Sequence, residues 1–539
     1  MTEFGSGDSA LVLRAKKWAP MLAIGLYAVA ALIFWTRDHW RPDWDSAIYL
    51  LTAASLQAGE GYRYLGEPFF LRPPGFSWLL SFAAGPNGFD FAMLNRLGMA
   101  FTVAAVGGVY WAMGPSLGRA RSLGVALLTG TSGLWVARFN FVLSDLPFLA
   151  LLFPALALFD LGLRGERGER DRRWEMRRML GGAVLLAAAA YLRTAALAAL
   201  PGLILLYAWR RRGRQRWLGW LPGLGVCAAM IPWLLYARRA AREAVRPSEQ
   251  LLLFDYMTAL LRQDSKDPGS ALLGLADWWT RIVANSAAIT QDLAIGAFGS
   301  EGRLAVTLVV IAVALGIVAA LRRGPDLIDG FAFFYSGLLV VYFTSDARLV
   351  IPLVPIVYRA CFEAVGLIPW ISWRRPAAGF ENAMPTQSRA ALVSAGILVV
   401  GFFAVNLAAL PTRLDAESMQ LPFGRKNVVW AQGAVWRDME SAADWLATQT
   451  PPDAHVISGP APSLSLLSGR RVYSYRFFRQ GRLIDRYEAR YAVIFPWAPP
   501  RIAAALRVRA TKRHRLPSVS QPNRWIEMLE YGTTSANVD

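Results

Sequence analysis

The stretch that decides the fold is RLAVTLVVIAVALGIVAALRR, residues 303–323. An uncharged, largely apolar run lies between Arg303 and the pair Arg322-Arg323. A helix needs about 20 such residues to cross a hydrocarbon core about 30 Å thick. Paired arginines at one end mark the cytoplasmic side, since short cytoplasmic loops are enriched in Lys and Arg. The segment therefore predicts a membrane span whose C-terminal end faces the cytoplasm.

Similar runs recur along the chain, which has 539 residues and is 55% hydrophobic. A soluble enzyme would show shorter apolar stripes with polar faces between them. We therefore predict an all-α polytopic membrane protein with about eleven spans. The predicted spans cover approximately residues 18–35, 90–112, 122–137, 145–163, 180–208 (as two short helices), 217–236, 303–321, 330–344, 348–370 and 390–410.

The positions of the arginines and lysines orient these spans. Residues 1–18 end in a basic cluster, which predicts a cytoplasmic N-terminus followed by an uncleaved anchor. Arginine-rich clusters flank both ends of 180–208, so both ends should lie inside. One straight helix cannot return to its starting side, and we therefore expect two helices that meet near Arg193, where protein or water satisfies the irregular backbone.

An odd number of spans places the tail, residues 411–539, outside the cytoplasm. Its pattern predicts a small α/β domain in the periplasm of a cell with an inner membrane. We expect a helix at 439–448 and strands at 455–458, 471–475 and 491–495.

The net charge of +19 could suggest a nucleic-acid binder. Much of the excess, however, sits in short arginine clusters between apolar blocks, as expected for span orientation. We therefore expect a lipid bilayer as the partner and no nucleic acid. The two cysteines, Cys227 and Cys361, lie inside apolar segments, which excludes a disulfide framework and a cysteine-based zinc site.

The first outer loop, residues 38–88, carries the most informative acid. Asp45 lies just outside the first span, at the start of a short amphipathic helix expected at 46–58 on the membrane surface. One interpretation is a helix N-cap, since a carboxylate there accepts backbone N–H groups. The other is a general base that faces a substrate hydroxyl.

The same loop contains Arg72-Pro73-Pro74-Gly75. Two prolines in series predict an extended backbone. Arg72 is either a surface arginine that reaches the lipid headgroups or a cation for a phosphate.

Further charges lie at the outer ends of spans. Arg138 and Asp145 flank the start of the span at 145–163, where a charge is costly unless it is paired or hydrated. They form either a structural ion pair or, with Asp145 as a second acid, a place for a metal ion or the acceptor. Arg193 interrupts an apolar stretch, and Arg348 opens the span at 348–370. With Arg72 they would place several cations on the outer face.

Together these residues resemble the GT-C membrane glycosyltransferases, in particular the branch of protein O-mannosyltransferases and aminoarabinose transferases. The resemblance covers residues 19–410, within which we expect 238–302 to be a second large outer loop. The matching features are an acid with an aromatic residue four positions later, a basic-Pro-Pro element, a Ser-Asp pair before a span, and Arg-x-x-x-Pro-x-x-Pro. In this chain they are Asp45 with Tyr49, Arg72-Pro73-Pro74, Ser144-Asp145, and Arg348 with Pro352 and Pro355.

The resemblance implies a GT-C catalytic domain that takes a sugar from a polyprenyl-phosphate-sugar donor, with inversion, and transfers it to a glycan, lipid or protein acceptor. Asp45 would be the base, with Asp145 as a second catalytic acid. Arg72 and Arg348 would hold the donor phosphate, and the substrate-binding set would further contain Tyr49, Glu67, Arg138 and Arg193.

The chain departs from the family pattern at two places. Ser46 follows Asp45 where protein O-mannosyltransferases carry a second acid, which leaves a divalent metal ion only a candidate cofactor. Phe70-Leu71 stands where aminoarabinose transferases carry an acid before the basic-Pro-Pro element, and Glu67 is the candidate substitute. Two alternatives stay open. One is a lipid-linked glycan polymerase or ligase, and the other is a transporter or flippase, against which stands the absence of duplicated halves in the sequence.

Overall fold

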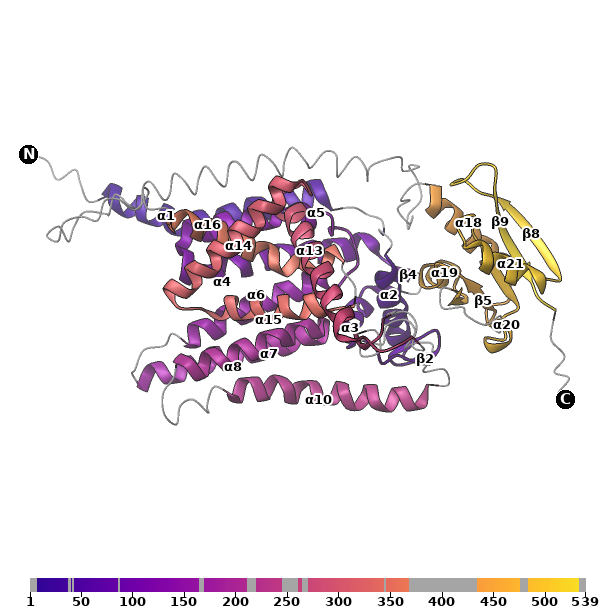
Figure 1. The fold of residues 1–539 in the computed structure, drawn as a ribbon, viewed down its shortest axis with the longest axis horizontal. Coiled ribbons are helices and arrows are strands. Elements are labelled where there is room, and N and C mark those ends of the chain that lie inside the picture. Colours follow the sequence, from indigo (N-terminus) through magenta and orange to yellow (C-terminus); the bar gives the residue numbers. More distant parts are fainter. Residues whose placement is uncertain are drawn as a thin grey trace, which may run out of the picture.

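A computed structural model of the protein shows a bundle of long helices beside a smaller α/β domain (Figure 1). It describes residues 7–36, 40, 43–85, 88–163, 169–210, 220–244, 260–263, 270–343, 346–367, 434–475 and 483–532.

The described part of the bundle is built from ten longer helices, with short elements between them. The longer helices are α1 (Gly7–Ala30), α4 (Phe91–Thr131), α6 (Asp145–Leu163), α7 (Glu169–Leu192), α8 (Ala199–Arg210), α10 (Trp220–Glu243), α13 (Leu275–Phe298), α14 (Arg303–Arg323), α15 (Leu327–Val341) and α16 (Val354–Leu367). The short elements are the π-helical turn η1 (Ala31–Trp35), α2 (Trp44–Gln57), β1 (Arg63–Tyr64), β2 (Glu67–Pro68), α3 (Gly75–Ser81), β3 (Ala84–Gly85), β4 (Gly88–Phe89), α5 (Gly133–Val136) and the 3-10 turns η2 (Thr194–Ala198) and η3 (Ala347–Leu353).

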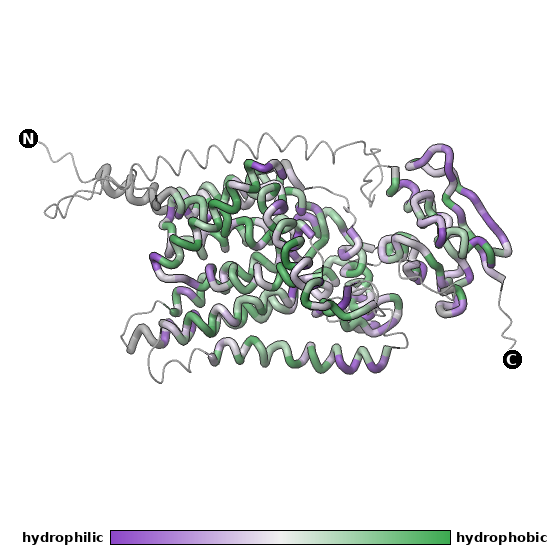
Figure 2. Tube along the Cα trace, viewed as in Figure 1, coloured by the Kyte–Doolittle hydropathy of each residue, from purple (hydrophilic) through white to green (hydrophobic). Residues whose placement is uncertain are grey.

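The helices fit a multi-pass membrane protein. Four of them, α4, α6, α10 and α14, are long and apolar enough to cross a bilayer, and three shorter apolar segments lie at Trp18–Ile33, Thr194–Trp209 and Leu327–Val341. Apolar residues dominate these helices in Figure 2. The predicted spans up to 348–370 each fall on a helix, whereas 390–410 lies outside the described residues. The total of about eleven spans therefore stays a prediction.

Two predicted spans, 90–112 and 122–137, fall mostly on one element, α4. Its backbone leaves the helical region at Gly118, where φ is 74° and ψ is 169°. A positive φ strains any residue that has a Cβ, so glycine suits this kink. The predicted boundary between the two spans is therefore a sharp bend rather than a loop, and the last residues of the second span form the separate helix α5.

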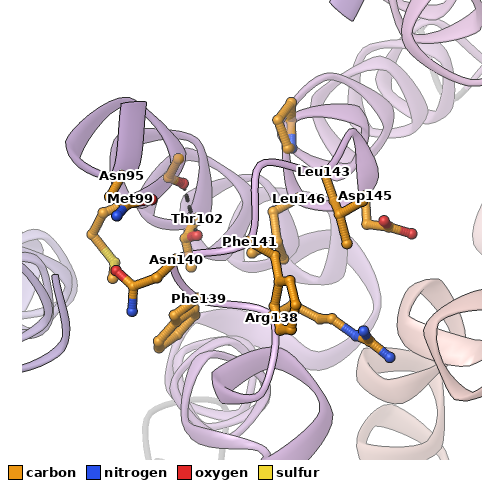
Figure 3. A pocket seen from close by; sticks show the side chains of 12 residues that line it. Asn95, Met99, Thr102, Arg138, Phe139, Asn140, Phe141, Leu143, Asp145 and Leu146 are labelled. Carbon is orange, nitrogen blue, oxygen red and sulfur yellow. Dashed lines mark hydrogen bonds between the residues drawn. The ribbon is translucent and has the colours of Figure 1, made fainter. Parts of the chain in front are cut away.

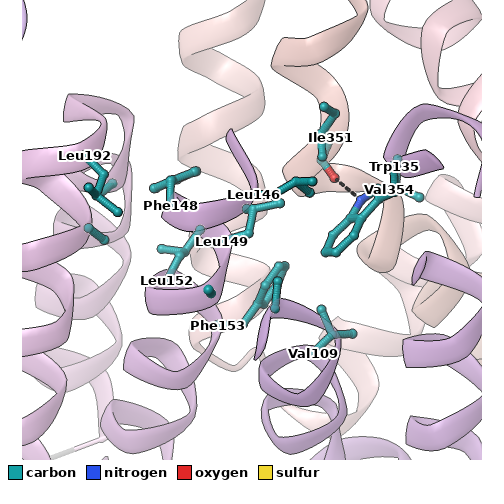
Figure 4. Close-up of a cluster of buried hydrophobic side chains, with 14 of the residues drawn as sticks. Val109, Trp135, Leu146, Phe148, Leu149, Leu152, Phe153, Leu192, Ile351 and Val354 are labelled. Carbon is teal, nitrogen blue, oxygen red and sulfur yellow. Dashed lines mark hydrogen bonds between the residues drawn. The ribbon is translucent and has the colours of Figure 1, made fainter. Parts of the chain in front are cut away.

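The core of the bundle centres on α6, which packs against α4 and α7. Phe148, Leu149 and Phe153 are fully or almost fully buried, and Trp135 of α5 lies beside them (Figure 4). The Trp135 indole N–H donates to the Ile351 carbonyl of η3 over 3.3 Å. Elements distant in the sequence are thus fixed to one another by apolar packing and one buried hydrogen bond.

The predicted interruption near Arg193 is present. Helix α7 ends at Leu192, Arg193 has extended backbone angles (φ −151°, ψ 122°), and η2 then leads into α8. Helix α8 lies close to α15, where a Cβ added to Gly202 would come within 2.9 Å of the Gly330 carbonyl carbon. Paired small residues permit this close helix contact.

The region 238–302, expected as an outer loop, contains the helix α13. It packs along α14 and α15, with buried residues on one side only. Asn285 fixes α13 to the end of α15, because its side-chain amide donates to the carbonyls of Val340 (3.0 Å) and Tyr342 (2.6 Å). These carbonyls have no helical partner of their own, so the asparagine acts as a cap supplied by another helix.

The C-terminal domain is a five-stranded sheet in the order β6-β5-β7-β9-β8. Strands β5, β6 and β7 are parallel to one another. Strand β9 runs antiparallel to both of its neighbours, β7 and β8. Its elements are α18 (Ala434–Gln449), β5 (His455–Ser458), α19 (Ala461–Ser468), β6 (Arg471–Ser474), α20 (Leu483–Arg486), β7 (Tyr491–Ile494), α21 (Pro500–Val508), β8 (Lys512–Pro517) and β9 (Trp525–Glu530). The predicted helix and three strands are confirmed.

Strands β8 and β9 were not predicted. The sequence of β8, Lys512 to Pro517, is mostly charged and exposed, so it lacks the alternation that signals a half-buried strand. Figure 2 shows this outer strand as hydrophilic. Charged residues and a proline are typical of a sheet edge, where they prevent pairing with another chain.

The C-terminal domain contacts the first outer loop. Helix α19 packs against α2, and Leu466 and Trp436 lie against the core of the helical bundle. In the β1–β2 hairpin, a Cβ added to Gly66 would lie 3.4 Å from the guanidinium carbon of Arg471. The helix that carries Asp45 is therefore enclosed between the bundle and this domain.

Candidate active site

Asp45 lies in the first turn of α2, but it is not the cap of that helix. Asp43 is the N-cap: its Oδ1 accepts the Asp45 backbone N–H over 2.9 Å, and Ser46 Oγ accepts the Asp43 N–H over 3.0 Å. The interpretation of Asp45 as a capping residue is therefore wrong. The expectation of a surface helix also needs correction, because most of α2 from Asp45 to Ala53 is buried by the rest of the protein.

Two arginines bind the Asp45 carboxylate from different parts of the chain. Arg72 Nη2 donates to Oδ1 over 2.7 Å, and Arg348 Nη1 lies 2.5 Å from Oδ2. Asp45 and Arg72 are only 7% and 8% exposed, so Arg72 is not a surface residue. Arg72 and Arg348, which lie far apart in the sequence, therefore meet at one carboxylate.

The charge of Asp45 depends on these arginines. Burial by itself raises the pKa of the Asp45 carboxyl, but Arg72 and Arg348 lower it more, and the net pKa lies well below its usual range. Opposite charges within about 4–6 Å favour the ionised form. Asp45 is therefore held as a carboxylate with an arginine on each oxygen.

The Arg-Pro-Pro element positions Arg72 differently from the prediction. Pro74 has helical backbone angles (φ −77°, ψ −5°) and begins α3, so the pair of prolines is not extended throughout. The Tyr62 hydroxyl donates to the Arg72 carbonyl over 3.1 Å, and the Tyr236 hydroxyl donates to the Tyr62 carbonyl over 2.9 Å. A buried tyrosine thus fixes the backbone from which Arg72 extends.

Tyr49 connects the first outer loop to the start of α6. Its hydroxyl lies 3.1 Å from Ser144 Oγ, and its ring centroid lies 5.3 Å from the Arg72 guanidinium carbon. That distance suits a cation–π interaction. Tyr49 therefore contacts the Arg72 side chain, whereas Tyr62 fixes its backbone.

Asp145 forms an ion pair with Arg193 rather than with Arg138. The pair links the start of α6 to the break after α7, which explains why an arginine is tolerated within an apolar stretch. Arg138 lies 3.8 Å from Asp346 instead. Figure 3 shows Arg138 and Asp145 at a separate small pocket, both pointing away from Asn95 and Met99.

A cavity of about 430 Å³ brings most of the predicted residues together. Of the candidates, Asp45, Tyr49, Arg72, Asp145, Arg193 and Arg348 line it. Arg138 is not among its lining residues, and Glu67 lies in the β1–β2 hairpin, opposite Tyr64. The structure therefore brings together both candidate acids and three of the four arginines.

A second cavity, of about 690 Å³, lies beside the first and is almost entirely apolar. Leu192 lines both cavities, Pro73 lines the first and Pro74 lines the second. Trp78, Trp233 and Tyr191 contribute much of its surface. The polar cavity and the apolar cavity thus adjoin at Leu192 and at the two prolines of the Arg-Pro-Pro element.

Sequence reasoning missed Asp346 and the roles of Asp43 and Tyr62. Asp346 lines the polar cavity and lies 2.9 Å from Arg348 Nε. Its position two residues before Arg348 was the available signal. A tyrosine that binds a backbone carbonyl has no sequence pattern that would reveal it.

The acids around the polar cavity do not suit a divalent cation. Within the described ranges, no three His, Cys, Asp or Glu side chains lie close enough to hold a metal ion. Asp45 is bound by two arginines and Asp145 by one. Guanidinium groups already supply the positive charge that a metal ion would bring, and no step below uses a metal.

Comparison with known proteins places this geometry in context. No family model matches the chain, and no curated protein matches its sequence. Among solved structures, ArnT from Cupriavidus metallidurans bound to undecaprenyl phosphate is 13% identical, with a TM-score of 0.55 over 97% of this chain and 100% of that one. The archaeal oligosaccharyltransferase AglB from Archaeoglobus fulgidus, in complex with an inhibitory peptide and a dolichol-phosphate, is 11% identical, with a TM-score of 0.52 over 97% and 75%.

A further structure of the Archaeoglobus fulgidus oligosaccharyltransferase, in complex with Zn and sulfate, is 12% identical with a TM-score of 0.56 over 88% of this chain and 67% of that one. At these identities the likeness concerns the fold, and it agrees with the resemblance found in the sequence. The chain therefore shares the fold of these ArnT and oligosaccharyltransferase structures.

Proposed function

We propose that the protein is a membrane glycosyltransferase that moves a sugar from a polyprenyl-phosphate-sugar donor to an acceptor at the outer face of the membrane. The observation that carries the proposal is the buried carboxylate of Asp45, bound by Arg72 and Arg348 in a polar cavity beside a large apolar one. The polar cavity suits a sugar and a phosphate, and the apolar one suits an isoprenoid chain.

The arginines would bind the donor phosphate. Arginine forms strong, charge-assisted hydrogen bonds with phosphate oxygens. An incoming phosphate would compete with Asp45 for Arg72 and Arg348, since both arginines lie within 2.7 Å of the carboxylate. Movement of a guanidinium from Asp45 to the phosphate would free one carboxylate oxygen at the moment the donor is in place.

Asp45 would then act as the general base. Its freed oxygen takes the proton of an acceptor hydroxyl, and the acceptor oxygen forms a bond to the anomeric carbon. The bond between that carbon and the phosphate oxygen breaks in the same displacement, so the configuration inverts. The electron pair leaves with the polyprenyl phosphate, whose negative charge the arginines stabilise.

The ligand complexes of the matched structures support a lipid-linked donor. ArnT was solved with undecaprenyl phosphate and AglB with a dolichol-phosphate. Because an oligosaccharyltransferase matches with a similar TM-score, a lipid-linked oligosaccharide donor is the second candidate. A bacterial inner membrane, with the C-terminal domain in the periplasm, is the location that fits the arginine-rich clusters of the sequence.

The proposal is tested by lipid analysis in a deletion strain that expresses either the wild-type protein or a variant. In the deletion strain we expect a polyprenyl-phosphate-sugar to accumulate, as identified by mass spectrometry. Wild type should clear this lipid, whereas Asp45→Asn should not, because loss of a general base slows transfer by about 10²–10⁴-fold.

Asp90→Asn is the matched control. It removes an exposed carboxylate that caps α4 and does not line the polar cavity, it keeps a good N-cap, and it should clear the lipid. If no lipid-linked sugar accumulates in the deletion strain, or if Asp45→Asn clears it at the wild-type rate, the proposal is wrong. Accumulation of a lipid-linked oligosaccharide would instead favour the second candidate.

A further inference from the structure

Asp346 contacts both the backbone and the side chain of Arg348, and it also lies 3.8 Å from the Arg138 guanidinium group. As the N-cap of η3, its Oδ1 accepts the Arg348 backbone N–H over 2.9 Å. Its other oxygen, Oδ2, lies 2.9 Å from Arg348 Nε. The nitrogen at the inner end of the Arg348 guanidinium group is thus next to Asp346, while Nη1 reaches Asp45.

This arrangement restricts an otherwise mobile side chain. A free arginine side chain loses rotamer entropy whenever its guanidinium group is fixed on a ligand. The ion pair with Asp346 restrains that group in advance and so removes part of the cost, as in other pre-organised electrostatic sites. The outer nitrogens can then turn between two neighbouring anions while Nε keeps its place.

We propose that Asp346 is a positioning residue for Arg348, which holds its guanidinium group at the cavity wall so that it can pass from Asp45 to the phosphate of the lipid donor. The inference rests on the proposed function and names the residue that organises its phosphate site. Asp346 lines the same cavity as Asp45 and Arg348, so its carboxylate lies beside the guanidinium group that it would hold in place.

If Asp346 served only to cap η3, Asp346→Asn would have little effect. Asparagine caps helices about as well as aspartate, because its side-chain oxygen accepts the same backbone N–H. Asp346→Asn therefore preserves the cap on η3. It cannot preserve the ion pair, because an amide carries no negative charge to attract the Arg348 guanidinium group.

The experiment measures binding of undecaprenyl phosphate to the purified full-length protein in detergent, with undecaprenol, which lacks the phosphate, as the reference ligand. For Asp346→Asn we expect the Kd of undecaprenyl phosphate to rise about tenfold. The Kd of undecaprenol and the thermal unfolding midpoint should not change. Asp346→Glu, which restores the charge, should recover part of the affinity.

Two further variants complete the design. Asp90→Asn alters another aspartate N-cap, that of α4, and should leave the Kd unchanged. Asp346→Asn combined with Arg348→Gln should bind no more weakly than Arg348→Gln alone, since the two residues act as one unit.

The outcomes separate this inference from the proposed function. If Arg348→Gln weakens binding of undecaprenyl phosphate but Asp346→Asn does not, the positioning role is overturned and the proposed function stands. If the wild-type protein binds undecaprenyl phosphate no better than undecaprenol, the proposed function fails and this inference fails with it.

Discussion

Both carboxylate oxygens of Asp45 are bound by arginines, so its basicity is set by neighbours that also suit a phosphate. Burial and pairing act on this group in opposite directions. Burial raises the pKa of Asp45, and the two arginines together lower it by more. Loss of one arginine should therefore raise the pKa of Asp45, because less positive charge then opposes the effect of burial.

Arg72→Gln tests this balance. Without the Arg72 charge, the pKa of Asp45 should rise, because only Arg348 then opposes the effect of burial. A base acts in its deprotonated form, so a raised pKa means that activity is lost at a higher pH as the solution is acidified. The acid limb of kcat/KM against pH should therefore move to higher pH in the variant.

The matched control is Arg63→Gln, which removes an exposed arginine of the same outer loop. It should leave the acid limb in place. A profile for Arg72→Gln that overlays that of the wild type would show that Asp45 is not the group that titrates.

At this scale the sequence revealed the members of the site but not their partners. The motifs located Asp45, Arg72 and Arg348 because these residues stand in short, ordered patterns. Pairing depends on side-chain geometry, which the sequence does not carry, so Asp145 was placed near Arg138 although it binds Arg193. The cap of α2 was assigned to Asp45 because the residues 43–45 contain two acids, and only backbone angles decide between them.

Among the helices, the least predictable feature is a cluster of charges where α14, α15 and α16 meet. Arg359 is 1% exposed, and its guanidinium group donates to both carboxylate oxygens of Asp326, over 3.1 and 2.6 Å. Arg323 joins the cluster through Asp326 and Asp329. The sequence marked Arg323 as a cytoplasmic flank of a span, but it could not show that Arg359 reaches the same acids.

The sequence predicted the boundaries of helices better than the contacts between them. The apolar runs and arginine clusters placed α6 and α14 to within two residues, because bilayer thickness fixes the length of a span, whereas α10 extends seven residues beyond its predicted end at 236. Helix α13 was missed because only one of its sides is apolar enough to pack, and a 24-residue amphipathic segment with many polar residues is typical of an outer loop. Its packing depends on Asn285, a contact made across helices.

The cluster at Asp326 yields a stability prediction. Arg359→Gln should lower the free energy of unfolding by about 3–5 kcal/mol, because it leaves a buried carboxylate without its main partner. The double variant Arg359→Gln/Asp326→Asn should lose less than the sum of the two single variants, since both changes remove the same interaction. Denaturation of the detergent-solubilised protein, followed by tryptophan fluorescence, measures these values.

Arg322→Gln provides the control for that series. Arg322 is adjacent to Arg323 but exposed, and its loss should change stability by no more than about 0.5 kcal/mol. Equal effects of Arg322→Gln and Arg359→Gln would mean that the cluster makes no specific contribution.

At the scale of the whole molecule, the arrangement of the C-terminal domain against the first outer loop links two parts that the sequence suggested were separate. Local patterns were enough to predict β5, β6 and β7, because each strand is a short apolar run beside a helix. No local pattern indicates that α19 packs on α2, since a contact between domains depends on their relative placement. The domain therefore contacts the helix, α2, that carries Asp45.

This contact predicts that the C-terminal domain restrains the helix that carries the base. Leu466 of α19 is partly buried against the core of the bundle and is not part of the apolar core of its own domain. Leu466→Asp should therefore weaken the contact without unfolding the domain, because a carboxylate is costly to bury unpaired. We expect faster backbone hydrogen exchange in α2, unchanged exchange in β5 and β7, and a lower kcat.

Val508→Asp is the control for this last substitution, since Val508 belongs to the same domain but is 84% exposed. It introduces the same charge and should change neither the exchange of α2 nor kcat. If Leu466→Asp leaves the exchange of α2 at the wild-type rate, the domain does not restrain that helix. Faster exchange in α2 with an unchanged kcat would show that the C-terminal domain is not needed to keep Asp45 within reach of its arginines, and that the packing of α2 on α3, and of α3 on α7, is enough.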